Sequence, residues 1–300
     1  MIMNILECYN PDSSAVINPG FGSGPIPGFP EVAVCCFMQS TVSRLLPELC
    51  QMKQEPLLRL PGSGAPVWIA EYTSEKAGTA PAGAPSAGSA VTEAAGSAPH
   101  DITPAAALAV CRFPVGAPAA AAALENLYAA GARAAVVFGT CGVLRSGIED
   151  CSVIIPQSAV RCEGTSFHYA PASDEITLNS RYKEEFVKIL ENLSLPYCEG
   201  KVWTTDAIYR ETRSAVKKRR KQGCICVDME CSALAAVSQF RGRDFFQFFC
   251  AADNLDAPEW EPRSLREYTK HDRKLLAVRA ALELASLMRH QPDAHKSISP

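Results

Sequence analysis

The sequence lacks several features that would have placed it in familiar classes of protein. It has no run approaching about 18 apolar residues, and its N-terminus carries acidic and polar residues where a secretion signal has a basic and then an apolar stretch. It also lacks a basic excess, since 29 Lys and Arg residues face 32 Asp and Glu residues, and nucleic-acid binding usually requires such an excess. We therefore expect neither a membrane nor a nucleic acid among its partners.

The sequence has no Cys-x-x-Cys pair, although it contains 13 cysteines. Their odd number and their positions in apolar runs, such as Cys35-Cys36 and Cys250, argue against a complete disulfide framework. Cys224-Ile225-Cys226 has no second pair of ligands at a zinc-like spacing. We expect reduced thiols, a cytoplasmic location, no metal and no organic cofactor.

Two segments are poor in regular structure. Residues 10–30 hold many prolines and glycines, which predicts an irregular lead-in. Residues 76–100 are almost entirely Ala, Gly, Ser, Thr and Pro, and such a composition cannot bury enough apolar surface to offset the chain entropy. We expect a flexible surface insertion there, within a single domain that spans residues 1–300.

The remaining segments alternate between short apolar runs and helical patterns, which is typical of an α/β layer fold with a largely parallel sheet. Strands are expected at residues 32–37, 108–113, 134–138, 153–155, 159–162 and 245–251. Helices are expected at residues 40–49, 118–130, 181–193, 229–240 and 264–289. Ser264 and Glu267 have the spacing of a capping box at the start of the last helix.

Three turns follow expected strands, and ligands in open α/β sheets gather beyond such strand ends. Val115-Gly116-Ala117-Pro118 and Gly139-Thr140-Cys141-Gly142 contain glycines that permit close backbone approach to an anion. Asp253 follows the third strand, where desolvation lets a carboxyl group keep a proton and pass it to a leaving group. Each turn also has a plain structural interpretation, as a tight connection or a helix cap.

A fourth feature is Asp228-Met229-Glu230, which leads into an apolar helix. Acidic residues in a first turn are favoured by the helix dipole, so capping is one explanation. The other is that a fixed carboxylate accepts hydrogen bonds from two neighbouring sugar hydroxyls.

These segments, in this order, resemble the nucleoside phosphorylase superfamily, which includes uridine phosphorylases, hexameric purine nucleoside phosphorylases and methylthioadenosine nucleosidases. The resemblance runs from about Leu108 to Asp256. Within this range, two more segments match the family: Gly164-Thr165-Ser166-Phe167-His168-Tyr169-Ala170-Pro171 and Trp203-Thr204-Thr205-Asp206-Ala207-Ile208-Tyr209-Arg210-Glu211. It implies a three-layer αβα fold around a mixed, largely parallel sheet. It also implies a pentosyltransferase that cleaves the N-glycosidic bond of a nucleoside, with inorganic phosphate as co-substrate, in a homo-oligomer such as a dimer or a trimer of dimers.

The resemblance also implies a role for individual residues. Asp253 takes the place of the aspartate that protonates the base in the family's purine enzymes, which favours a purine nucleoside. The other implied contacts are Met229 and Glu230 with the ribose, Gly139 and Thr140 with phosphate, and Thr205, Asp206 and Ile208 with the base.

Departures from the family pattern keep the reaction open. The family's phosphorylases bind phosphate with a glycine-aspartate-proline turn near the N-terminus, which residues 1–50 do not reproduce, and with an arginine where this chain has Val137. Arg112 or Arg44 would have to substitute, because a guanidinium suits a phosphate wherever it can reach one. Thr212 and Ser214 replace the residues that read uracil, which disfavours uridine. A phosphorylase, a nucleosidase that uses water and a non-catalytic nucleoside-binding protein all remain open.

Overall fold

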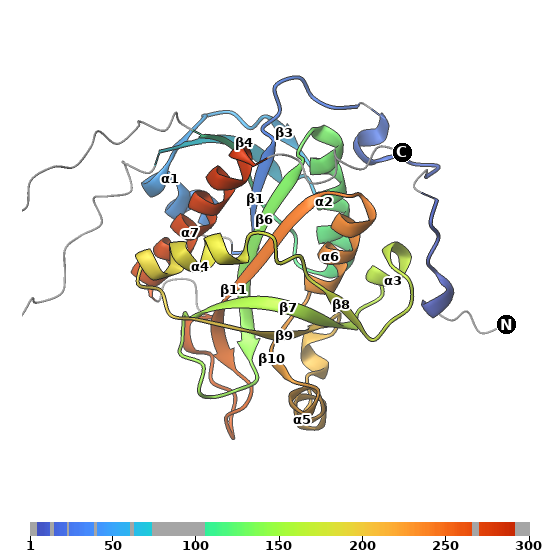
Figure 1. The fold of residues 1–300 in the computed structure, drawn as a ribbon, viewed down its shortest axis with the longest axis vertical. Coiled ribbons are helices and arrows are strands. Elements are labelled where there is room, and N and C mark those ends of the chain that lie inside the picture. Colours follow the sequence, from blue (N-terminus) through green and yellow to red (C-terminus); the bar gives the residue numbers. More distant parts are fainter. Residues whose placement is uncertain are drawn as a thin grey trace, which may run out of the picture.

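A curved mixed sheet forms the frame of the molecule (Figure 1). The computed structural model describes residues 5–12, 15–22, 24–38, 41–60, 63–73, 106–265 and 270–291. The predicted insertion at residues 76–100 lies outside them. The strands are β1 (Val32–Cys36), β2 (Gln51–Met52), β3 (Leu58–Arg59), β4 (Pro66–Tyr72), β5 (Ala106–Arg112), β6 (Ala134–Val143), β7 (Val153–Cys162), β8 (Glu175–Thr177), β9 (Tyr197–Thr205), β10 (Cys224–Asp228) and β11 (Asp244–Asn254).

The strands lie in the order β10-β9-β7-β11-β6-β1-β5-β4-β2, with β3 beside β4 and β8 beside β7. The central strands β11, β6, β1 and β5 run parallel, whereas β4 and β7 pair with them in the antiparallel sense. The last residues of β6 also pair with β10, where Cys226 faces Val143 and Val227 faces Gly142. The sheet therefore curls back on itself and brings the ends of β6, β10 and β11 together.

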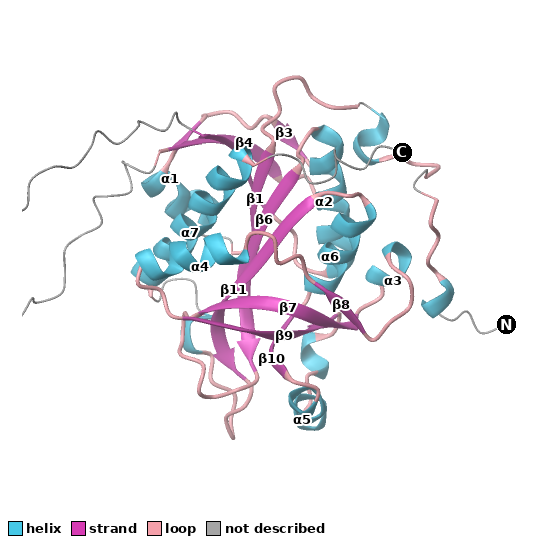
Figure 2. Ribbon diagram, in the orientation of Figure 1, coloured by secondary structure: helices cyan, strands magenta, loops and turns pink. Residues whose placement is uncertain are grey.

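Helices cover both faces of the sheet (Figure 2). One face carries α1 (Leu46–Leu49), α4 (Lys183–Asn192) and α7 (His271–His290), and the other carries α2 (Ala117–Ala130), α3 (Ser166–Tyr169) and α6 (Cys231–Phe240). In β1, Val34 packs with the α7 side whereas Ala33 and Cys35 pack with the α2 side. Such a strand is apolar at successive positions because both of its faces are buried. The predicted three-layer αβα fold with a mixed, largely parallel sheet is confirmed.

Three predictions differ from the structure. Gly139-Thr140-Cys141-Gly142 and Asp253 do not lie in turns after strands, because β6 continues to Val143 and β11 continues to Asn254. The last helix begins at His271 and not at Ser264. The Ser264 hydroxyl donates a hydrogen bond to Asp150 (2.5 Å), and residues 263–265 form a separate helical turn. The two strands expected on either side of Pro156 are one strand, β7, because Pro156 lies at an irregularity in its pairing with β9 and needs no ladder hydrogen bond there.

The described part of the chain has no helix that is both long enough and apolar enough to span a membrane. All 13 cysteines lie within it as free thiols, most of them buried in the sheet and its flanking helices.

Candidate functional site

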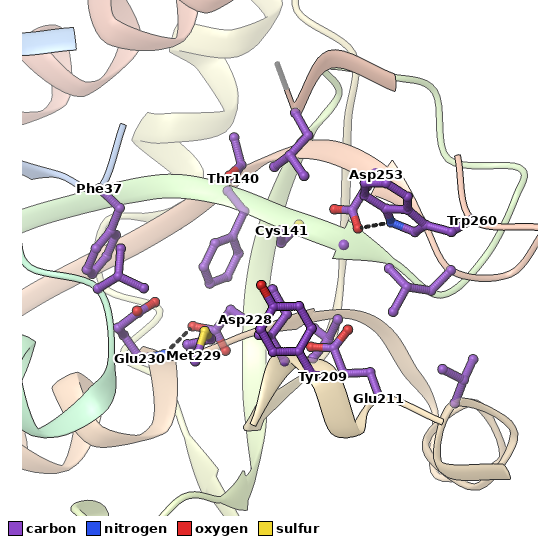
Figure 3. Close-up of a pocket in the computed structure, with 18 of the residues that line it drawn as sticks. Phe37, Thr140, Cys141, Tyr209, Glu211, Asp228, Met229, Glu230, Asp253 and Trp260 are labelled. Atoms are coloured by element: carbon purple, nitrogen blue, oxygen red, sulfur yellow. Dashed lines mark hydrogen bonds between the residues drawn. The ribbon is translucent and has the colours of Figure 1, made fainter. Parts of the chain in front are cut away.

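A cavity of about 840 Å³ opens where β6, β10 and β11 end. Six of the nine predicted site residues line it: Arg112, Thr140, Ile208, Met229, Glu230 and Asp253. We call the part around Thr140, Met229 and Glu230 the inner end, and the part formed by Ile208, Tyr209, Glu211, Asp253 and Trp260 the outer end. Figure 3 shows Glu230 and Met229 on the opposite side of the cavity from Asp253 and Trp260, with Phe37 on the same side as Glu230.

The inner end is organised by Asp228, the last residue of β10. Its carboxylate accepts hydrogen bonds from the backbone N–H groups of Glu230 (2.9 Å) and Cys231 (2.6 Å), and from the Thr204 hydroxyl (2.8 Å). These bonds satisfy donors at the start of α6 that have no partner within the helix. The capping explanation of the acidic motif therefore describes Asp228.

Glu230 faces the cavity instead. Its Oε1 accepts a hydrogen bond from the Gly116 N–H (2.6 Å), at the start of α2. Gly116 has a φ of 103°, a conformation that side chains disfavour, so this contact depends on glycine. Burial, followed by the charge of Asp228, raises the pKa of Glu230 above its ordinary range. A carboxyl group fixed in this way has a second oxygen available for the hydroxyls of a ligand.

Thr140 and Arg112 lie in the same cavity, as expected for an anion site. Thr140 belongs to β6, and Arg112 ends β5 in register with Cys36 of β1. Arg112 has no ion-pair or hydrogen-bond partner among the described residues, so its guanidinium is available to a ligand. Phe37, directly after β1, packs edge-on against Phe113 with 5.9 Å between the ring centroids, and gives this region an apolar wall.

The outer end is built around Asp253 at the end of β11. Its Oδ2 accepts a hydrogen bond from the Trp260 indole N–H (2.8 Å) (Figure 3). A side chain at Gly142 would place its Cβ 2.4 Å from Leu255 and 3.3 Å from Asp253 Oδ1. The glycine of β6 therefore gives the Asp253 carboxylate its space.

Glu211 lines the outer end together with Asp253 and was not predicted from the sequence. It follows a helical turn, η5 (Ile208–Arg210), and precedes Thr212, which caps α5 (Arg213–Lys221). Burial and then the charges of Asp253 and Asp228 raise the pKa of Glu211 to about 7. Two carboxyl groups, those of Glu211 and Asp253, therefore line the same end of the cavity.

The cavity is not lined by three predicted residues, Gly139, Thr205 and Asp206. Gly139 lies behind Phe37, since a Cβ added to it would come within 3.2 Å of the Phe37 Cβ. Thr205 is buried and its hydroxyl accepts a hydrogen bond from the Ala207 N–H (3.3 Å). Asp206 accepts a hydrogen bond from the Gly164 N–H (3.0 Å), which joins two loops.

Of Glu211, Trp260 and Phe37, which line the cavity but were not predicted, the sequence contains a signal for Glu211 alone. Glu211 closes the segment that resembles the family's base-binding loop, so its position was marked although its role was not. Trp260 and Phe37 carry no motif, and long-range contacts alone place them in the cavity. The described residues hold no group of three or more His, Cys, Asp or Glu side chains placed to bind a metal ion.

Comparisons with known proteins agree with this architecture. A uridine phosphorylase structure from Vibrio fischeri superposes with a TM-score of 0.65 at 18% identity, over 90% of this chain and 99% of the other. The purine nucleoside phosphorylase of Toxoplasma gondii gives a TM-score of 0.64 at 17% identity, over 87% and 93% of the two chains. At these identities the similarity establishes the fold.

Sequence relatives point in the same direction. A guanosine phosphorylase from Halorubrum lacusprofundi is 26% identical over 135 residues, which cover 45% of this chain and 56% of the relative. A DeoD-type purine nucleoside phosphorylase from Bacillus cytotoxicus is 26% identical over 165 residues, or 53% of this chain and 68% of the relative. The sequence profile of the phosphorylase superfamily matches residues 103–288. The chain therefore belongs to the phosphorylase superfamily.

Proposed function

We propose that this chain cleaves the N-glycosidic bond of a purine nucleoside by phosphorolysis, which releases the free base and a sugar 1-phosphate. One observation carries the proposal: a single cavity holds a fixed carboxylate, Glu230, at its inner end and a second one, Asp253, at its outer end. A nucleoside needs one carboxyl group for each of its two parts, because its sugar offers hydroxyl donors and its base must gain a proton to leave.

The sugar is assigned to the inner end. Glu230 would accept hydrogen bonds from two neighbouring ribose hydroxyls while the Gly116 N–H holds its other oxygen. Met229 would pack under the ring. A carboxylate fixed before substrate binds loses little entropy on binding, so it orients the anomeric carbon at low cost.

The base is assigned to the outer end. As the bond between the anomeric carbon and N9 breaks, its electron pair stays on the purine, and a carboxyl proton from Asp253 would neutralise the charge that builds up there. Trp260 occupies Asp253 Oδ2 and leaves Oδ1 for the base. The sugar becomes oxocarbenium-like, and a phosphate oxygen attacks its opposite face.

Phosphate is assigned to Thr140 and Arg112. The hydroxyl and the free guanidinium lie in the same cavity as Glu230, and a guanidinium binds phosphate through two parallel hydrogen bonds. The names of the two phosphorylase relatives support this assignment.

Hydrolysis is the second candidate, for a specific reason. Val137, which takes the place of a family arginine, is buried in the core, and apolar Phe37 follows β1. A weakened phosphate site favours water as the nucleophile in an otherwise unchanged cavity. The homo-oligomer implied by the resemblance remains a prediction.

The test is release of free base from inosine, guanosine, adenosine and uridine, with and without inorganic phosphate, by the wild type and by Arg112→Ala. We expect phosphate-dependent release from the purine nucleosides, and a rise of about tenfold in the KM for phosphate in the variant, because a charge-assisted hydrogen bond contributes on the order of 1.5–3 kcal/mol. Arg145→Ala, which changes an exposed arginine outside the cavity, is the matched control.

The outcomes separate the three functions. Release at equal rates without phosphate would establish a nucleosidase. Release from uridine alone would refute the assignment of Asp253 to a purine. Binding without release from any nucleoside would leave a nucleoside-binding protein.

A further inference from the structure

Glu211 lines the cavity but takes no part in the proposed mechanism and, unlike Asp228, caps no helix with its side chain. Its backbone is fixed on both sides: its N–H donates to the Ile208 carbonyl (3.2 Å), and the next residue, Thr212, caps α5 through a hydrogen bond from the Ala215 N–H (3.2 Å). Its half-buried side chain lines the outer end, and its carboxyl group has no hydrogen-bond or ion-pair partner among the described residues. A half-buried carboxyl group without a protein partner is available to a ligand.

The charges around Glu211 are mostly of its own sign. Asp253 of β11 and Asp228 of β10 both line the cavity, and their charges act on Glu211. The neighbouring Arg213 does not neutralise it, because that guanidinium donates to the carbonyls of Leu255 (3.0 Å), Ala257 (2.6 Å) and Pro258 (2.6 Å).

The other charged groups of the cavity are engaged elsewhere or lie at the inner end. Lys274 donates to the Ser264 carbonyl (2.9 Å), Glu230 accepts from Gly116, and Arg112 lies next to the end of β1. Burial and the two aspartates raise the pKa of Glu211 to about 7, so near neutral pH this side chain is present in both forms.

The two forms of a carboxyl group match different bases. The neutral acid has one donor and one acceptor, which fit the N1 acceptor and the 6-amino donor of adenine. The ionised carboxylate has two acceptors, which fit the N1–H and 2-amino donors of guanine. When the form of the carboxyl group does not match the base, buried donors or acceptors are left without a partner. Such unpaired polar groups discriminate between two substrates more strongly than the loss of an apolar contact does.

We propose that Glu211 reads the N1 edge of the purine and that its protonation state selects the base, a 6-aminopurine when it is protonated and a 2-amino-6-oxopurine when it is ionised. Glu211 is then a specificity-determining residue, distinct from Asp253, which acts where all purines are alike. The inference rests on the proposed function, since it assigns the base to the outer end of the cavity.

The experiment measures the ratio of kcat/KM for adenosine to that for guanosine at about pH 6, 7 and 8. Both nucleosides carry the same ribose, so titration of Glu230, Asp228 or phosphate affects both rates alike and cancels in the ratio. We expect the ratio to fall by about tenfold or more from about pH 6 to 8, since the protonated fraction of a group with a pKa of about 7 falls from roughly nine-tenths to one-tenth.

Two variants separate this role from a structural one. Glu211→Gln carries one donor and one acceptor at every pH, so its ratio should favour adenosine and should not vary with pH. Glu259→Gln, which removes the same charge from an exposed carboxylate outside the cavity, should keep the wild-type profile.

A wild-type ratio that is constant with pH, or a pH-dependent ratio that persists in Glu211→Gln, would overturn the inference. If no nucleoside is cleaved, the proposed function fails, and the same ratio is then taken from the dissociation constants of adenosine and guanosine. If the preference for adenosine over guanosine falls with rising pH in the wild type and stays constant in Glu211→Gln, base selection by Glu211 is still supported. Binding of neither nucleoside would overturn that too.

Discussion

The two ends of the cavity differ in how firmly the fold determines them. At the inner end, Asp228 and Glu230 are each only 6% exposed and both accept backbone hydrogen bonds. At the outer end, Ile208, Tyr209 and Trp260 are 50%, 96% and 56% exposed. The inner end is assembled from strand ends and helix starts, whereas the outer end is assembled largely from loops.

This difference suggests how substrate choice is divided within the site. Contacts at the inner end cannot change without disturbing the sheet or α6, so the sugar recognition proposed there would be tied to the fold itself. Loops tolerate substitution far better than the elements they connect, so the base preference proposed for the outer end could change while the inner end stays constant. Variants at the two ends should therefore fail in different ways.

The largest effect is expected at the end of β11. Asp253→Asn should lower kcat/KM for a purine nucleoside by about a hundredfold or more, because general acid catalysis typically contributes 10²–10⁴. The unfolding free energy should stay close to that of the wild type, since Asn keeps an oxygen for the Trp260 N–H. Steady-state kinetics measure this loss, with Asp174→Asn, which changes an exposed acid outside the cavity, as the control. A decrease in kcat/KM of less than threefold would show that Asp253 is not the general acid.

A smaller effect is expected for Glu230→Gln at the inner end. The amide keeps an acceptor for the Gly116 N–H but binds the ribose hydroxyls without charge assistance, so kcat/KM should fall by about 30-fold. A 2′-deoxynucleoside offers one hydroxyl fewer, and the variant should lose less activity towards it. Equal losses for both substrates would show that Glu230 does not read that hydroxyl.

The sequence predicts the inner end better than the outer end, for a physical reason. Met229 and Glu230 belong to a local acidic motif that leads into an apolar helix, and Thr140 comes at the end of an expected apolar strand, so residues close in sequence were enough to mark the inner end. At the outer end, Asp253 carried such a local signal, because it comes near the end of the apolar strand β11. Glu211 and Trp260 lie on loops, and contacts that no local pattern encodes direct them into the cavity. Arg213, for example, fixes this region through carbonyls about 45 residues further along the chain.

The same limit explains the errors in the fold. The buried strands β1, β5, β6 and β11 were predicted because both of their faces are apolar over several residues. The start of the last helix was wrong because Ser264 donates its hydroxyl to Asp150, a residue 114 positions away, and so does not cap a helix. A capping box is a local signal, and here a tertiary contact overrides it.

Removing the cap beneath Glu230 tests whether the fold fixes the inner end. Asp228→Ala should lower the free energy of unfolding by about 1–2 kcal/mol, because it leaves the Cys231 N–H and the Thr204 hydroxyl without an acceptor in a buried region. Urea unfolding measures this loss, with Asp174→Ala as the exposed control. Stability unchanged from that control would contradict the view that sugar recognition is tied to folding.

The smallest effect is expected for Trp260→Phe at the outer end. The variant keeps an aromatic ring beside the base but removes the N–H that holds Asp253 Oδ2, so kcat/KM for purine nucleosides should fall by about threefold, in line with one net hydrogen bond. Because Trp260 is more than half exposed, unfolding in urea should not change measurably. The comparison with Asp228→Ala is the critical result. If Trp260→Phe loses activity but not stability, and Asp228→Ala loses stability, then loops position the residues proposed to bind the base, and the fold itself positions those proposed to bind the sugar. A Trp260→Phe variant destabilised as much as Asp228→Ala would place both ends in the same cooperative unit and remove the distinction.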